Sequence, residues 1–129
     1  MKTYNSINEL NIPAKLNKFL KKYLVNISHI PSIDRIILFG SCAKGYATAD
    51  SDIDLLILGD SIDQDAETEI FCSCIPDVPP DEYVSIDIIV STHETYDKHK
   101  TRLGYVERQI ERDGIDVSGY ITDLGGVIV

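Results

Sequence analysis

The segment Ile53–Leu58 constrains the fold of this 129-residue chain more than any other stretch. Five of its six residues are aliphatic, and such a nearly unbroken apolar run is typical of a strand that is covered on both faces. We therefore predict an internal strand of a small sheet that is flanked by helices. The chain length suits one domain of this kind and hardly allows two.

Two further strands and an N-terminal helix are expected around this strand. Residues 35–39 and 84–90 are rich in β-branched and aromatic side chains, which favour strands. A helix is expected after Pro13, a residue that suits the first turn of a helix. Its apolar side chains recur at helical spacing: Leu16, Phe19, Leu20, Tyr23 and Leu24.

The remaining segments carry weaker signals. Ser6-Ile7-Asn8-Glu9 and Ser91-x-x-Glu94 both have the spacing of a capping box. The second is expected to open one long helix that ends at Gly114, with an apolar stripe of Tyr96, Leu103, Val106 and Ile110. Short helices are predicted within residues 42–51 and near 66–71, and the tail from 115 either adds a short strand or docks loosely. The whole pattern predicts an α/β (α+β) domain.

The composition excludes several classes of protein. The formal net charge is −9, and so acidic a chain repels nucleic acid, which argues against generic DNA or RNA binding. No apolar run approaches the ~20 residues that cross a bilayer. The N-terminus lacks the apolar core and cleavage site of a signal peptide, so we expect a cytoplasmic protein without membrane contact. The odd cysteine count indicates three reduced thiols, at Cys42, Cys72 and Cys74.

Asp52-x-Asp54 is the first candidate site. Side chains two residues apart on a strand project to the same face, so the two carboxylates repel one another unless a cation lies between them. The spacing alone is weak, because Asp50-x-Asp52 and Asp63-x-Asp65 share it. The pair Asp52/Asp54 differs because it enters an apolar strand.

Asp87 supplies a third carboxylate, within the apolar run of residues 84–90. Burying a charge there without a partner is costly. If this strand lies beside Ile53–Leu58, Asp87 can converge with the other two carboxylates on a divalent cation. The alternatives are neutralisation by a nearby Lys or Arg and a place on an exposed edge.

Gly40-Ser41 ends the strand at residues 35–39. Glycine permits a tight turn and a close approach of the backbone to a ligand, and a serine that opens a helix can hold phosphate oxygens. An ordinary strand-to-helix turn explains an isolated Gly-Ser equally well. Lys44 either neutralises a phosphate group or lies on the surface, and Gly45 is expected to relieve backbone strain where the short helix ends.

The combination of these parts resembles the nucleotidyltransferase superfamily of DNA polymerase β. Gly40-Ser41, the ten residues 42–51 and Asp52-x-Asp54 match the pattern of its small prokaryotic branch, the minimal nucleotidyltransferases. Residues 107–115 also look like the usual helix ending of that family. The resemblance covers most of residues 5–117 and leaves 59–83 unsupported.

The resemblance implies a polymerase-β-like nucleotidyltransferase fold in one domain, with a core over residues 5–117 and a tail over 118–129. It implies ATP or another nucleoside triphosphate as donor, and Mg²⁺, or else Mn²⁺, as the metal. Asp52, Asp54 and Asp87 would bind metal and carry the catalysis. The nucleotide-binding residues would be Gly40, Ser41, Lys44 and Ser51.

Some features depart from the family pattern. Cys42 and Lys44 stand where many relatives have arginine, which weakens the expected grip on phosphate, while Asp50 and Glu82 add negative charge near the site. The chain also lacks the second domain with which larger relatives bind their acceptors. The minimal branch resembles antitoxins that modify a small helical HEPN-type toxin, so a HEPN-type partner is expected, and a homo-oligomer is a further possibility. The alternatives are a catalytically silent antitoxin or binding module and a small-molecule transferase of the aminoglycoside-modifying type.

Overall fold

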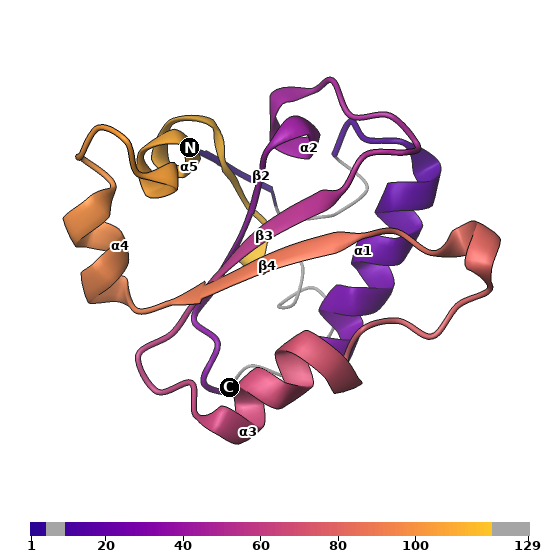
Figure 1. The fold of residues 1–129 in the computed structure, drawn as a ribbon, viewed down its shortest axis with the longest axis horizontal. Coiled ribbons are helices and arrows are strands. Elements are labelled where there is room, and N and C mark those ends of the chain that lie inside the picture. The colour runs from indigo at the N-terminus through magenta and orange to yellow at the C-terminus, as the bar shows by residue number, and fades with distance from the viewer. Residues whose placement is uncertain (5–9, 120–129) are drawn as a thin grey trace.

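The computed structural model describes residues 1–4 and 10–119 of the chain. Its centre is a mixed five-stranded sheet with the strand order β1-β5-β2-β3-β4 (Figure 1). The strands are β1 (Lys2–Thr3), β2 (Arg35–Phe39), β3 (Ile53–Leu58), β4 (Ile86–Ser91) and β5 (Ile115–Asp116). β3 runs antiparallel to β2 and parallel to β4. The predicted mixed sheet with flanking helices is confirmed.

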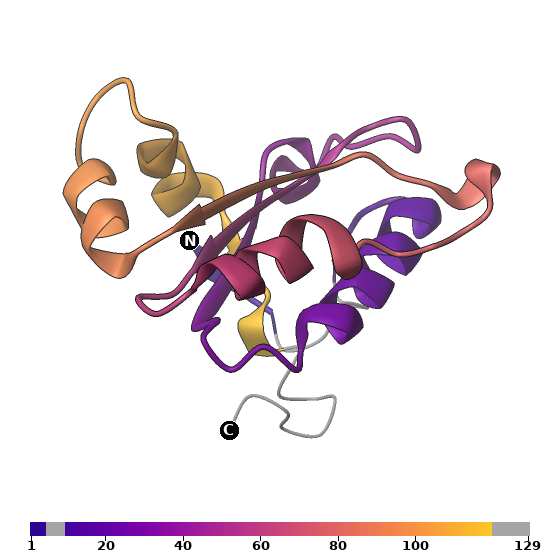
Figure 2. The ribbon, with the colours of Figure 1, turned by 60° about the horizontal axis from the view of Figure 1, so that its bottom comes forward.

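Helices cover both faces of this sheet (Figure 2). On one face, α1 (Ala14–Ile27) and α3 (Gln64–Thr68) pack over the larger core, to which β3 contributes Ile53, Leu55 and Ile57. On the other face, α4 (His93–His99) and α5 (Val106–Asp113) cover a smaller core, to which β3 contributes Leu56 and Leu58. The alternation of β3 between two cores explains its unbroken apolar sequence, as predicted.

The N-terminal helix matches its sequence pattern. Pro13 occupies the N-cap position of α1, where its missing N–H group costs nothing. All five residues of the predicted stripe are buried, together with Ile27. The capping-box segment Ser6-Ile7-Asn8-Glu9 lies outside the described residues.

The prediction of one long helix after β4 is wrong. Two short helices, α4 and α5, replace it, and Leu103 between them is 82% exposed. Thr92, not Ser91, caps α4 by accepting a hydrogen bond from the Thr95 N–H group. The break contains Gly104 at φ +88°, a left-handed conformation that ends a helical path.

Other boundaries shift by a few residues. The helix expected near 66–71 begins earlier, at Gln64, because the Asp63 side chain caps it, and it continues as a π-helical turn, Glu69–Ser73. The short helix after Gly40 is α2 (Ser41–Lys44), and a 3-10 turn (Pro80–Glu82) precedes β4. The tail does add a strand, β5, which pairs with the unexpected β1.

Two expectations from composition can be compared with the structure. The three cysteines are free thiols, as predicted. Within residues 1–4 and 10–119, no helix has the length and apolar character needed to cross a membrane.

Candidate active site at one end of the central strands

The register of β3 and β4 brings two carboxylates together. Asp54 and Asp87 are direct partners across this parallel pair, so that the charge of Asp87 acts on Asp54. Asp54 alternates with the buried Leu55 along β3, so it projects toward the face that α4 and α5 cover. The strand that carries Asp87 therefore lies beside β3, which is the condition for convergence with Asp54, and it is also an exposed edge strand, which was the alternative.

Gly40 closes over this pair from the neighbouring strand. Phe39, the last residue of β2, is the partner of Asp54, so the chain turns into α2 directly beside the carboxylate. Gly40 adopts φ +72° and ψ −151°, a region open mainly to glycine. A Cβ atom at this position would lie 2.2 Å from Asp54 Oδ2. The glycine is thus required by conformation and by contact with the site.

Asp54 lies in an electrostatically unbalanced environment. Burial, followed by the charges of Asp87 and Asp52 and by the hydrogen bond to Asp87, raises its pKa to about 6. The pKa of the neighbouring Cys42 thiol is also raised, to about 11, by burial and by Asp54 and Asp52. Neither the ion pairs nor the hydrogen bonds of the described residues give Asp54 or Asp87 a cationic partner. This chemistry suits a divalent cation with oxygen ligands.

The third predicted carboxylate, Asp52, does not close fully onto the other two. It is exposed at the entrance to β3, and its backbone carbonyl accepts a hydrogen bond from the Cys42 thiol at 3.6 Å. Its charge acts on Asp54. In the described chain, however, these three side chains do not bring one ligand atom each within 4.8 Å of one another.

The predicted nucleotide-binding residues differ in their contacts. Ser41 opens α2, and its side chain makes no hydrogen bond with another described residue. Lys44 is exposed and lines a cavity of about 130 Å³ with Gly40, Gln109 and Asp113. The Ser51 hydroxyl instead accepts a hydrogen bond from the Thr48 N–H group at 2.8 Å, which holds the turn before Asp52.

The negative charge expected from Glu82 is offset. Its carboxylate pairs with Lys18 of α1, and this hydrogen bond lowers the pKa of Glu82. The groove beside this pair, of about 300 Å³, is lined by α1 and residues 78–82. None of Asp52, Asp54 and Asp87 lines this groove; Asp52 and Asp87 are exposed, and Asp54 is half-buried.

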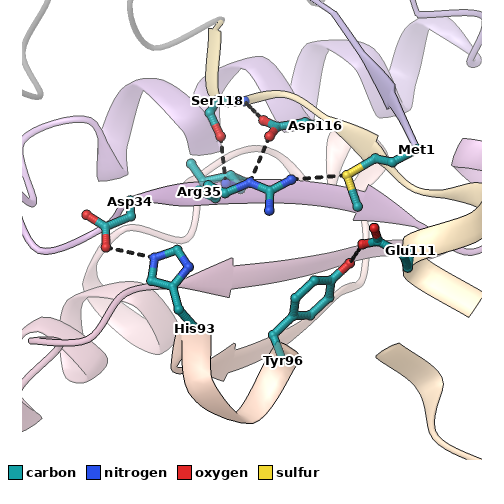
Figure 3. Close-up of polar contacts among 9 residues, drawn as sticks. Met1, Asp34, Arg35, His93, Tyr96, Glu111, Asp116 and Ser118 are labelled. Atoms are coloured by element: carbon teal, nitrogen blue, oxygen red, sulfur yellow. Dashed lines mark hydrogen bonds and ion pairs between the residues drawn. The ribbon is translucent and has the colours of Figure 1, made fainter. Parts of the chain in front are cut away.

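A second group of potential ligands lies at the opposite end of the same strands, and Figure 3 shows two of its members, Asp34 and His93. Asp34, Asp60 and His93 bring one ligand atom each within 4.8 Å of one another. His93 Nε2 lies 2.9 Å from Asp34 Oδ2, and the His93 N–H group donates to Asp60 Oδ1 at 3.0 Å. These contacts bind the first turn of α4 to the sheet. Sequence reasoning missed this group because the three residues meet only when three strands are in register. The available signal was their position, since each lies within two residues of the end of a strand.

The chain matches one protein family and is similar to several solved structures. The family model for the nucleotidyltransferase domain matches residues 15–118. A crystal structure of a proposed nucleotidyltransferase from Sulfolobus solfataricus is similar at 24% identity and a TM-score of 0.46, over 63% of this chain and 70% of that one. No curated protein matches the chain significantly.

Gly40→Ala tests the contact between α2 and Asp54. We expect this variant to lose more than about 2 kcal/mol of stability, since backbone strain adds to the displacement of the carboxylate. Gly45→Ala is the matched control: Gly45 has φ +88°, but a Cβ atom added there would meet no atom within 4 Å, so only about 1 kcal/mol of backbone strain is expected. Urea unfolding measures both. Equal losses would contradict the proposed contact.

Asp54→Asn tests the raised pKa of Asp54. The pKa of Asp54 lies near 6 in the folded protein, above its value in the unfolded chain. The folded protein therefore loses stability as pH rises between these two values. The variant removes this loss, so its Tm should exceed that of the wild type more at pH 7.5 than at pH 4. Thermal unfolding in metal-free buffer measures the difference. An unchanged or smaller difference at pH 7.5 would show that the carboxylate is already neutralised.

Proposed function

Because this chain belongs to the nucleotidyltransferase domain family of the polymerase β superfamily, we propose that Asp54 and Asp87 form the centre of its active site. The observation that carries this proposal is the pairing of the two carboxylates on adjacent strands without a cationic side chain. Such a pair is stabilised by a divalent cation, Mg²⁺ or Mn²⁺. We propose Asp52 as the third ligand, brought in by a rotation of its exposed side chain.

The donor is proposed to be ATP or another nucleoside triphosphate. Gly40 lets the backbone approach the site, and Ser41 offers a hydroxyl group and an N–H group to the phosphates. Lys44, exposed at the end of α2, supplies the nearby positive charge. Ser51 acts indirectly in this proposal, because its hydroxyl holds the turn that leads into Asp52.

The reaction is transfer of a nucleoside monophosphate to a hydroxyl group. The acceptor oxygen forms a bond to the α-phosphorus, the bond from that phosphorus to the oxygen bridging the β-phosphate breaks, and pyrophosphate leaves with the electron pair. Asp87, exposed on β4, receives the proton of the hydroxyl group. Asp52, Asp54 and Asp87 would hold the divalent cation, which would supply positive charge to offset that of the phosphates.

A partner protein is the acceptor that we favour. Asp52 and Asp87 are exposed, and five cavities of about 130–460 Å³ among the described residues are lined without any of the three carboxylates. A protein acceptor brings its own binding surface, whereas a small molecule needs an enclosing pocket. In line with the resemblance to minimal nucleotidyltransferases, we propose a HEPN-type helical protein as the acceptor and an antitoxin role for this chain.

Calorimetric titration of ATP with Mg²⁺ tests the site. We expect metal-dependent binding to the wild type and its loss in Asp52→Asn/Asp54→Asn, because the ligands of the cation are gone. Asp65→Asn is the matched control from the other Asp-x-Asp sequence, where Asp63 caps a helix. His93→Ala controls for the second group of ligands.

The result distinguishes the remaining functions. If Asp52→Asn/Asp54→Asn still binds but His93→Ala does not, the cation site would be assigned to the opposite end of the strands. A well-folded wild type that binds no Mg²⁺ and ATP, but still neutralises a toxin, would favour the catalytically silent antitoxin. Transfer of label from ATP to an aminoglycoside without any partner would favour the small-molecule enzyme.

A further inference from the structure

β4 is an edge strand of the described sheet, and no residue within 1–4 and 10–119 pairs with its outer backbone groups. It ends the strand order at the side of β3, with no strand beyond it among the described residues (Figure 1). The Ile53 N–H group donates to the Ser85 carbonyl and the Gly59 N–H group to the Ser91 carbonyl. These two hydrogen bonds show that Ser85 and Ser91, and hence every second residue between them, face β3. The N–H and C=O groups of Ile86, Ile88 and Val90 therefore point away from β3. They make no hydrogen bond with any residue among those described.

The sequence of this edge does not protect it. Natural edge strands commonly carry a lysine, a proline or a bulge that prevents pairing with another chain. None of these residues occurs in Ile86–Ser91, where Asp87 is the single charge. Ile89 is 37% exposed on the same face as Asp87. The edge therefore has the free groups, length and apolar character of a strand that accepts a partner.

The position of Asp87 gives the edge a specific use. A strand added antiparallel to β4 would exchange hydrogen bonds at Ile86, Ile88 and Val90, which makes Asp87 a non-hydrogen-bonded position. Side chains at such positions are close neighbours, with Cβ atoms about 4.5–5.5 Å apart. A residue opposite Asp87 would thus project beside the Asp54–Asp87 pair.

We propose that an extended, basic segment of the acceptor protein adds to β4 as a sixth strand and presents its hydroxyl residue opposite Asp87. This inference rests on the proposed function and names the way in which the acceptor is held. The register requires an apolar residue opposite Ile89, two positions before the hydroxyl residue in an antiparallel segment. The exposed Asp81 and Glu94 near the two ends of β4, with the net charge of −9, favour basic residues in the segment.

The test uses Val90→Pro with Val90→Ala as its matched control. The Val90 N–H group faces outward, so proline removes an edge donor and keeps the pairing with β3. Alanine removes the same side chain but retains the N–H group. The probes are synthetic peptides in which one tyrosine moves stepwise through an alternating Lys-Val frame, incubated with Mg²⁺ and α-labelled ATP.

Tyrosine at a valine position is expected to be labelled at least about tenfold more than tyrosine at a lysine position. Val90→Pro should lose at least about tenfold of this labelling relative to Val90→Ala, while both bind ATP with Mg²⁺ equally, because a lost edge donor and a blocked edge weaken strand addition. Equal labelling of both variants would overturn the inference.

A second readout separates docking from chemistry. Binding of a fluorescent Val-x-Tyr peptide, followed by anisotropy, measures strand addition without transfer. Binding that Val90→Pro loses supports the docking edge even if the proposed function fails. The inference is overturned if the wild type does not bind the peptide, or binds it only after removal of residues 120–129. It is also overturned if sedimentation shows a wild-type dimer that Val90→Pro converts to a monomer.

Discussion

The parallel pairing of β3 with β4 is the constraint on which the site depends. Its register sets Asp54 opposite Asp87, and the antiparallel pairing of β2 brings Gly40 against the same carboxylate. A slip of one residue would send Asp87 to the opposite face of the sheet. The register is held because Ile86, Ile88 and Val90 of β4 pack against the larger core, and a slip of one residue would turn these side chains away from it. The fold therefore fixes the geometry of groups that repel one another.

This arrangement has an energetic cost that other parts of the chain offset. Asp54 has a raised pKa because it is partly buried beside two like charges, and Gly40 occupies a backbone region that most residues avoid. Both features concentrate at the carboxylates that we propose as the centre of the active site. The compensation comes from α1, which buries six side chains, and from the ties of α4 to the sheet and to α5, through His93–Asp34 and Tyr96–Glu111 (Figure 3).

The sequence predicted the parts that are specified locally. Long apolar runs gave β2 and β3 at their observed bounds, and the apolar setting of Asp52-x-Asp54 distinguished it from Asp63-x-Asp65, where Asp63 serves as a helix cap. The features that were missed depend on distant contacts. The two-residue strands β1 and β5 exist through pairing with each other, and Asp34, Asp60 and His93 meet only once three strands are in register. The break before α5 was missed because Leu103 fits the helical period yet lies exposed.

The exposure of Asp52 and Asp87 bears on how so small a domain selects an acceptor. An enclosing pocket requires additional chain, whereas an edge strand offers backbone groups that already exist. In β4 the outward backbone of Ile86, Ile88 and Val90 alternates with Asp87, so the proposed docking edge and the proposed proton acceptor share one strand. A segment held by that edge would bring its side chain to the carboxylate through the pleat of the sheet alone. Recognition and chemistry would then depend on the same β3–β4 register.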